Sequence, residues 1–284
     1  MVELEPRTLV SGLVVGESPR WHDGRLWFAN WGVAQEIRTV DVGGRGEVIA
    51  KGPKPAGFCI DFLPNGALLV TGEGQILRRQ GDGSFVTHAD LSHLGQAWNE
   101  ITVDNHGNIY VNDVGFRFGQ EQFRPGIIAL VTPDGRARQV ADNIAFPNGM
   151  VVTPDNSTLI VAESFARTLT AFDIATDGSL SNRRVWAAEI GADGICLDAE
   201  GAIWSPNIAA GTPEVIRLRE GGEVLQRIPL GAACFACMLG GDDGKTLFMM
   251  AAEWRGVERM GELFQARTGR VLTVEATAPH AGRP

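Results

Sequence analysis

Short apolar runs recur along the whole chain, and turns rich in Asp, Asn and Gly separate them. Two apolar runs around such a turn have the pattern of a β-hairpin whose turn needs a positive φ angle. Six of these units occur, at residues 20–28, 60–70, 101–111, 150–161, 195–204 and 238–248. Good helix formers do not gather into long stretches with a helical period, so the pattern predicts an all-β protein.

The turns of the six units are evenly spaced. Their markers are Gly24, Gly66, Gly107, Asn156, Gly201 and Gly244, with successive spacings of 42, 41, 49, 45 and 43 residues. A repeat of this length with four strands is typical of a β-propeller, whereas a β-sandwich explains the regular spacing poorly. We therefore predict one domain over residues 1–284, a six-bladed β-propeller with four-stranded antiparallel blades around a central channel.

Further strand-like runs lie between the hairpins and at the chain ends. Those between hairpins, predicted to be the outer strands of the blades, are residues 36–40, 127–131, 169–173 and 215–218. Residues 8–10 precede the first hairpin, and residues 262–265 and 270–274 follow the sixth. We expect one end of the chain to complete a blade that the other end begins, because such closure removes exposed sheet edges.

The inner strand of each propeller blade begins at one mouth of the channel, so residues at these starts should converge on the axis. Counting eight residues back from the turn markers gives Phe58, Asn99, Asn148, Asp193 and Ala236, and counting seven back in the first unit gives Glu17. Buried carboxylates and carboxamides are costly unless they are paired or coordinate a cation. The oxygen-donor members of this set predict a hard divalent cation.

The second strand of each hairpin returns to the same mouth. Its polar ends, predicted to form a wall around the site, are Asn30, Glu73, Asp113, Glu163, Asn207 and Glu253. Residues 115–126 form a long connection with aromatic and charged side chains, which suits a lid over the mouth. Around this mouth we predict substrate contacts from Trp98, Asn99, Asp113, Arg117 and Glu121.

Three motifs, in their order along the chain, resemble the SMP-30/gluconolactonase/luciferin-regenerating-enzyme family. They are Gly16-Glu17-Ser18-Pro19, Phe146-Pro147-Asn148-Gly149 and Asp193-Gly194-Ile195-Cys196-Leu197-Asp198-Ala199-Glu200-Gly201. The resemblance covers essentially the whole chain and implies a six-bladed propeller with one divalent metal at the channel mouth.

By the same resemblance, the metal ligands would be Glu17, Asn148 and Asp193, with Asn99 nearby to hold substrate or water. Asp193 would also be the general base. One position departs from the family pattern: Ala97 stands where sugar-lactonase members often carry an arginine that grips the substrate. This difference predicts a substrate less polar than an aldonolactone.

These features favour a metal-dependent hydrolase that opens a lactone, with the metal polarising the carbonyl and Asp193 taking the proton of water. We expect one divalent cation, Ca²⁺ in first place, with Mn²⁺, Mg²⁺, Zn²⁺ or Fe²⁺ as alternatives. Two other hypotheses stay open: hydrolysis of another electrophile, such as a phosphoester or a cyclic imine, and a non-catalytic binding propeller with a structural ion. The carboxylates at the axis favour an enzyme, although the fold alone does not choose.

Composition and charge limit the kinds of partner that we expect the protein to bind. The net charge of −9 and the pI of about 5.1 argue against a nucleic-acid partner, which needs a basic face. The chain has no run of 18 apolar residues and no signal-peptide pattern at its start, which predicts no membrane span and no secretion. Four cysteines do not make a disulfide scaffold. We therefore predict a cytoplasmic monomer or small homo-oligomer with reduced thiols that acts on a small molecule.

Overall fold

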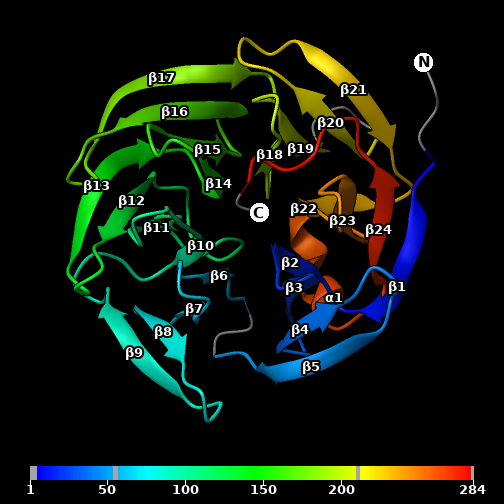
Figure 1. The fold of residues 1–284 in the computed structure, drawn as a ribbon, viewed down its shortest axis with the longest axis horizontal. Coiled ribbons are helices and arrows are strands. Elements are labelled where there is room, and N and C mark those ends of the chain that lie inside the picture. Colours follow the sequence, from blue (N-terminus) through cyan, green and yellow to red (C-terminus); the bar gives the residue numbers. More distant parts are fainter. Residues whose placement is uncertain (1–4, 54–56, 209–211, 283–284) are drawn as a thin grey trace.

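Six four-stranded antiparallel sheets follow one another around a central channel in the computed structural model of the protein (Figure 1). The structure describes residues 5–53, 57–208 and 212–282. Each sheet is one blade, and its first strand lies next to the channel. The predicted six-bladed β-propeller is confirmed.

The first five blades each use four consecutive strands, ordered from the channel outward. Blade 1 contains β2 (Gly16–His22), β3 (Arg25–Asn30), β4 (Glu36–Val40) and β5 (Gly46–Lys51), and blade 2 contains β6 (Ile60–Phe62), β7 (Leu68–Gly72), β8 (Gln75–Arg79) and β9 (Phe85–Asp90). Blade 3 contains β10 (Trp98–Val103), β11 (Ile109–Asp113), β12 (Gly126–Val131) and β13 (Ala137–Ile144). Blade 4 contains β14 (Pro147–Val152), β15 (Thr158–Glu163), β16 (Thr168–Ile174) and β17 (Leu180–Ala188), and blade 5 contains β18 (Cys196–Leu197), β19 (Ile203–Asn207), β20 (Glu214–Leu218) and β21 (Val224–Pro229).

Blade 6 joins the two ends of the chain. It contains β22 (Ala233–Gly240), β23 (Thr246–Ala252) and β24 (Gly269–Glu275), and its outermost strand is β1 (Arg7–Leu13). β1 pairs antiparallel with β24 from Arg7 opposite Thr273 to Leu13 opposite Gly269 (Figure 1). The expected closure by the chain ends is confirmed. The segment at 262–265 is not a strand, because a short helical excursion, η2 (Val257–Arg259) and α1 (Met260–Leu263), occupies this part of the connection between β23 and β24.

The hairpin turns are where the sequence spacing places them. The φ angles of the markers are positive in every unit: 70° at Gly24, 81° at Gly66, 84° at Gly107, 57° at Asn156, 75° at Gly201 and 73° at Gly244. The runs predicted as outer strands are instead third strands, namely β4, β12, β16 and β20. The outermost strands were not predicted because much of their surface is exposed to solvent, so they lack an apolar run. In β17, for example, six of the nine residues are exposed.

Inner strands of four blades, β2, β10, β14 and β22, carry one extra residue near the mouth. In β2, Glu17 lies opposite Ala29 but Arg20 lies opposite Trp27. The same shift occurs in β10 between Trp98 and Ile101, and in β14 between Pro147 and Met150. Such β-bulges bend a strand and re-aim its side chains. The bulges therefore lie at or beside the positions predicted to converge on the axis.

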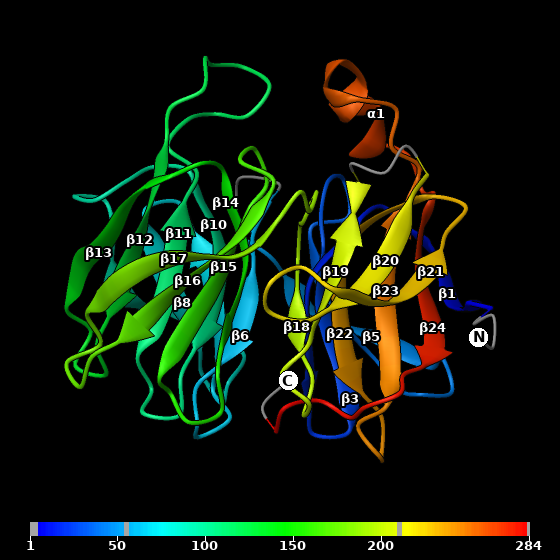
Figure 2. The ribbon, with the colours of Figure 1, turned by 90° about the horizontal axis from the view of Figure 1, so that it is seen from above.

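The two faces of the ring differ. The connection at residues 114–125, between β11 and β12, rises on the same face as α1 (Figure 2). The C-terminal segment lies on the opposite face. The four cysteines are buried and free, in agreement with the prediction of reduced thiols. No helix within residues 5–53, 57–208 and 212–282 is long and apolar enough to cross a membrane.

The closure of blade 6 by β1 leads to a prediction about stability. A chain that begins at Val14 lacks β1 and leaves the edge of β24 unpaired, so we expect a lower thermal midpoint and concentration-dependent aggregation. A chain that begins at Pro6 keeps β1 and serves as the control. Thermal unfolding followed by circular dichroism, with light scattering, measures both effects. Equal thermal midpoints for the two chains would contradict the prediction.

Candidate active site at the channel mouth

A cavity of about 1340 Å³ opens at the end of the channel where the inner strands begin. All four polar side chains predicted to converge there line it: Glu17 from β2, Asn99 from β10, Asn148 from β14, and Asp193 from the segment before β18. The structure thus brings residues from blades 1, 3, 4 and 5 to one place. These residues lie up to 176 positions apart along the chain, yet they come together in space because each occupies the same point of its repeat.

The two carboxamides are oriented by the protein around them. Asn99 Nδ2 donates a hydrogen bond of 3.2 Å to the carbonyl oxygen of Pro147. Asn148 Nδ2 lies 3.4 Å from Ser164 Oγ, which in turn donates to the carbonyl oxygen of Ala192 over 2.8 Å. With the amide nitrogens engaged in this way, the carboxamide oxygens are the atoms left to act as ligands.

Glycines let the inner strands of blades 4, 5 and 6 come into contact. A methyl group on Gly149 would lie 2.5 Å from the backbone nitrogen of Ile195, and one on Gly194 would lie 2.5 Å from Ala236 Cβ. Gly149 N donates to the carbonyl oxygen of Asp193 over 3.2 Å. Each glycine directly follows a candidate ligand, and neither has a positive φ angle. They serve close approach rather than a turn, and they hold Asn148 beside Asp193.

Burial dominates the electrostatics of the acids. Burial raises the pKa of Glu17 well above its usual range, and the nearby carboxylates of Asp193 and Glu100 raise it further. Burial also raises the pKa of Asp193 to about 8, and Glu100 adds to the effect, whereas hydrogen bonds from Asn148 and Gly194 oppose it. Among the described residues, no Lys or Arg forms an ion pair with Glu17 or Asp193.

This donor set fits a divalent cation. Buried Glu17 and half-buried Asp193 have no basic partner among the described residues, so their carboxylates need a positive charge, and the carboxamide oxygens complete a hard, all-oxygen environment. In the described part of the chain, no cluster of three or more His, Cys, Asp or Glu side chains has the arrangement of a metal site. The candidate site differs from such a cluster because half of its donors are amides.

The other residues predicted to contact substrate divide into two groups. Trp98 and Arg117 line the cavity. Asp113 and Glu121 do not: Asp113 accepts a hydrogen bond from Gly115 N over 2.6 Å, and Glu121 Oε2 accepts from Arg117 N over 3.0 Å. Their carboxylates hold the backbone of the connection after β11 and leave substrate contact to its other side chains.

The polar ends of the second strands contribute less to the wall than predicted. Of the six, Glu73 lines the cavity. Asn30 is buried and its Oδ1 accepts from Val14 N over 3.0 Å, and Glu163 is buried and forms an ion pair of 2.8 Å with Arg183. These side chains satisfy backbone and charge partners inside the blades, so they are unavailable to a ligand.

Comparison with known proteins agrees with the geometry. The model of the SMP-30/gluconolactonase/LRE-like region matches residues 15–253. The chain belongs to this family. The match includes all four candidate ligand positions, from Glu17 to Asp193, so the resemblance seen in the three motifs is confirmed.

Three members or neighbours of the family are informative. The diisopropyl-fluorophosphatase of Loligo vulgaris is 30% identical over 222 residues, which cover 69% of this chain and 70% of that protein. A 6-deoxy-6-sulfogluconolactonase of Pseudomonas putida is 25% identical over 240 residues, covering 82% of this chain and 78% of that one. The structure of a luciferin-regenerating enzyme superposes with a TM-score of 0.81 at 18% identity over 97% of each chain, which shows a shared fold. The fluorophosphatase and the lactonase are hydrolases, and their similarity supports a hydrolase activity for this chain.

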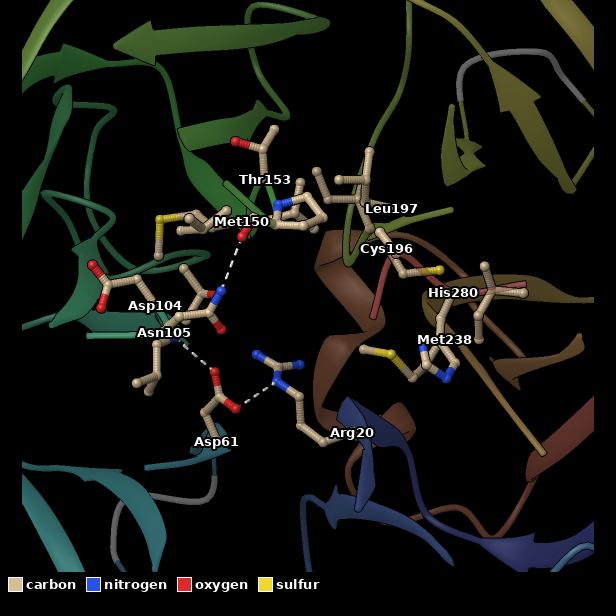
Figure 3. A pocket seen from close by; sticks show the side chains of 18 of the residues that line it. Arg20, Asp61, Asp104, Asn105, Met150, Thr153, Cys196, Leu197, Met238 and His280 are labelled. Carbon is tan, nitrogen blue, oxygen red and sulfur yellow. Dashed lines mark hydrogen bonds and ion pairs between the residues drawn. The ribbon is translucent and has the colours of Figure 1, made fainter. Parts of the chain in front are cut away.

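A charged network beneath the candidate ligands was not predicted from the sequence. Glu100 Oε1 lies 3.0 Å from Ser18 Oγ and 3.1 Å from Arg20 Nη2. The Nε atom of Arg20 forms an ion pair of 3.4 Å with Asp61 Oδ1, and Figure 3 shows the two side chains pointing toward each other from β2 and β6. Arg20, Glu100 and Asp61 are all buried. The available signal was a charged residue inside the inner-strand runs of blades 1, 2 and 3, as in Asn99-Glu100-Ile101.

The far end of the channel is covered. A second cavity of about 50 Å³ lies there, lined by the ends of the same inner strands and by His280 (Figure 3). His280 N donates to the carbonyl oxygen of Gly244 over 3.0 Å, and Ala281 N donates to that of Leu197 over 3.1 Å. The C-terminal segment therefore spans blades 5 and 6 at this end, and the large cavity at the mouth is the approach to Glu17 and Asp193.

The buried network predicts an unequal effect of two arginine substitutions. Arg20→Met removes the cation that pairs with Glu100 and Asp61, and leaving such charges uncompensated typically costs about 3–5 kcal/mol of unfolding free energy. Arg184→Met removes an arginine of the outer strand β17, which pairs with the exposed Asp173, and its effect should be small. Urea unfolding of both variants measures the difference. An equally small loss of unfolding free energy in the two variants would contradict a structural role for the network.

Proposed function

We propose that the protein is a divalent-metal-dependent hydrolase that opens a lactone at the channel mouth. The observation that carries this proposal is the pair of carboxylates of buried Glu17 and half-buried Asp193, which lack a basic partner among the described residues and face a cavity of about 1340 Å³ together with two carboxamides. The sulfogluconolactonase relative supports a lactone as the substrate class.

Each side chain has a distinct part in this proposal. Glu17, Asn148 and Asp193 would hold the cation, and Asn99 would orient the substrate or the attacking water. The bound cation would supply Lewis-acid polarisation of the ester carbonyl. Asp193 would accept the proton of the water, since burial makes its carboxylate a stronger base than a solvated aspartate. Water adds to the carbonyl carbon, the ring ester C–O bond breaks, and the product is a hydroxy acid.

A second candidate function is hydrolysis at phosphorus. The relative from Loligo vulgaris, a diisopropyl-fluorophosphatase, favours it. The same oxygen donors and the same base would serve either electrophile, because both reactions develop negative charge on an oxygen next to the attacked atom. A panel of lactones and phosphorus esters, assayed with metal-stripped and reconstituted protein, separates the two. Metal binding without turnover of either class would favour a binding propeller with a structural ion.

The raised pKa values predict how the metal-free protein responds to pH. The pKa of Asp193 is about 8 in the folded state against a usual 3.8, so the folded state binds more protons between these values. Stability therefore falls as pH rises through this window. We expect the thermal midpoint of metal-stripped protein to drop from pH 5 to pH 8. A divalent cation should raise this midpoint more at pH 8 than at pH 5.

The matched variant for this measurement is Asp193→Asn, which removes one of the two buried charges. Its thermal midpoint should fall less over the same pH range, and the cation should stabilise it less. A midpoint of wild-type protein that does not respond to Ca²⁺, Mn²⁺, Mg²⁺ or Zn²⁺ at either pH would contradict the proposed metal site.

Two substitutions separate the ligand role from the base role. Asp193→Asn keeps an oxygen donor but removes the proton acceptor, so activity should fall about 10²–10⁴-fold even when metal is saturating. Glu17→Gln also removes one charge but leaves Asp193, so its rate loss should largely recover at saturating metal. Rate and metal content are measured for both variants across metal concentrations. Full recovery of Asp193→Asn at saturating metal would make Asp193 a ligand only.

A further inference from the structure

Aromatic side chains are concentrated around the candidate active site. The chain has 13 Phe and 7 Trp, and ten of these residues line the cavity at the mouth. They are Trp31, Phe58, Trp98, Phe116, Phe118, Phe146, Phe165, Phe235, Trp254 and Phe264. The polar candidate ligands therefore form the floor of a cavity whose upper walls are mainly apolar.

Five phenylalanines on one side of the cavity contact one another, and we call them the phenylalanine wall: Phe116, Phe118, Phe123, Phe146 and Phe165. Phe146 and Phe165 are stacked, with ring centroids 4.7 Å apart and planes 15° from parallel. Phe118 meets Phe146 edge-on at 5.0 Å. All but Phe123 line the cavity. Aromatic pairs in these geometries pack well and present flat faces and edges to a ligand.

The wall has features that a ligand would explain. Phe165 is 49% exposed although it is a large apolar residue. Phe146 has a φ angle of 61°, which is rare for a bulky side chain and is retained when the surroundings require it. An apolar ligand that covers this surface would remove it from water, and contiguous apolar surfaces of this kind mark binding sites.

The wall begins directly beside the candidate metal ligands. Phe146 lies two positions before Asn148, and Phe165 follows Ser164, whose hydroxyl lies 3.4 Å from Asn148 Nδ2. A substrate whose carbonyl lies at the floor would thus place the substituent nearest its ring against these phenyl groups. Just before β10 of the neighbouring blade, Ala97 lines the same cavity with a methyl group and offers no side-chain hydrogen bond to a sugar hydroxyl.

The cavity also has a roof. A methyl group placed on Gly119, between Phe118 and Gln120, would lie 3.2 Å from Met260 Cε and 3.6 Å from Val257 Cγ1. The connection that carries three of the wall's phenylalanines therefore meets the helical excursion of blade 6 above the mouth (Figure 2). Met260 and Leu263 line the cavity from that side, so a substituent on the wall is enclosed by apolar groups.

We propose that the substrate is a lactone whose ring carries a large apolar substituent, best an aromatic one, that binds against the phenylalanine wall. This inference rests on the proposed lactonase function and names its substrate class. The cavity of about 1340 Å³ exceeds the roughly 300–1,000 Å³ typical of small-molecule sites, so an unsubstituted sugar lactone would leave most of the apolar wall wet. Such a polyhydroxylated ring would also place hydroxyl groups against phenyl faces, where they lose hydrogen bonds to water.

The first test is a series of δ-lactones with hydrogen, methyl, butyl or phenyl on the ring carbon next to the ring oxygen, compared with gluconolactone. With metal-loaded wild-type protein, kcat/KM should rise along the series by about tenfold or more between methyl and phenyl, because added apolar groups gain this much in a hydrophobic pocket. Gluconolactone should be the poorest substrate. A flat series, or gluconolactone as the best substrate, would overturn the proposal.

Two substitutions assign the selectivity to the wall. In Phe118→Ala and Phe165→Ala, the ratio of kcat/KM for the phenyl lactone to that for the unsubstituted lactone should fall about tenfold. Phe85→Ala removes a phenylalanine of the outer strand β9, away from the cavity, and should keep the wild-type ratio. The ratio is independent of the fraction of folded protein, so a loss of stability alone does not move it. An unchanged ratio in both wall variants would overturn the proposal.

A binding measurement separates this proposal from the lactonase assignment. 2-Phenyltetrahydropyran resembles the phenyl lactone but has no ester to hydrolyse, and Trp31, Trp98 and Trp254 line the cavity, so their fluorescence reports occupancy. It should bind at least tenfold more tightly than tetrahydropyran, and Phe118→Ala should remove the difference. If this holds while no lactone is opened, the proposed function fails and the apolar ligand class stands. Equal binding of both ethers would overturn the apolar class.

Discussion

The mouth of this propeller depends on one constraint: two carboxylates, of which one is buried and the other half-buried, line the same cavity without a basic partner among the described residues. Burial raises the pKa of both Glu17 and Asp193, the carboxylate of Asp193 raises that of Glu17 further, and Glu100 raises both. A protein that kept such a group without a cation would pay for it in stability. The rest of the site is organised around this unfavourable charge: two carboxamides line the same cavity, Arg20 pairs with the acids of the network beneath it, and aromatic side chains line the surrounding walls.

The backbone achieves this convergence with simple devices. Bulges in β2, β10 and β14 re-aim one position on each inner strand, and glycines after Asn148 and Asp193 let neighbouring inner strands touch. Asn112 links the bulged strands directly, since its Nδ2 donates to the carbonyl oxygen of Asn148 over 2.8 Å and its Oδ1 accepts from Glu100 N over 3.1 Å. Three of the four ligand positions, Glu17, Asn99 and Asn148, are therefore held by strands, which favours precise geometry, and Asp193 lies in the segment just before β18.

Much of the fold was predictable because the turns repeat. Gly24 and Asn156 mark the same point of different blades, and counting back from such markers located Glu17, Asn99, Asn148 and Asp193. Counting does not show which partner a side chain takes. Asp113 looks like a wall residue in sequence, yet its oxygens accept hydrogen bonds from the backbone of its own blade, at Gly115 N and Ala97 N. The pairing of Arg20 with Asp61 joins two repeats, and no periodicity in one sequence reports such a contact. The phenylalanine wall likewise draws on three separate segments.

The pairing of β1 with β24 bears on how the protein is made. These strands are separated by more than 250 residues in the chain. During synthesis β1 can therefore pair only after β24, the last strand, has been made, and blade 6 is complete only then. Loop closure over such a distance is slow, and open strand edges are exposed meanwhile. Glu17 sits on the inner strand of blade 1 and Asp193 just before that of blade 5, with only blade 6 between these two blades. The metal site can therefore assume its final geometry only when synthesis is nearly complete, so ion capture would follow ring closure rather than guide it.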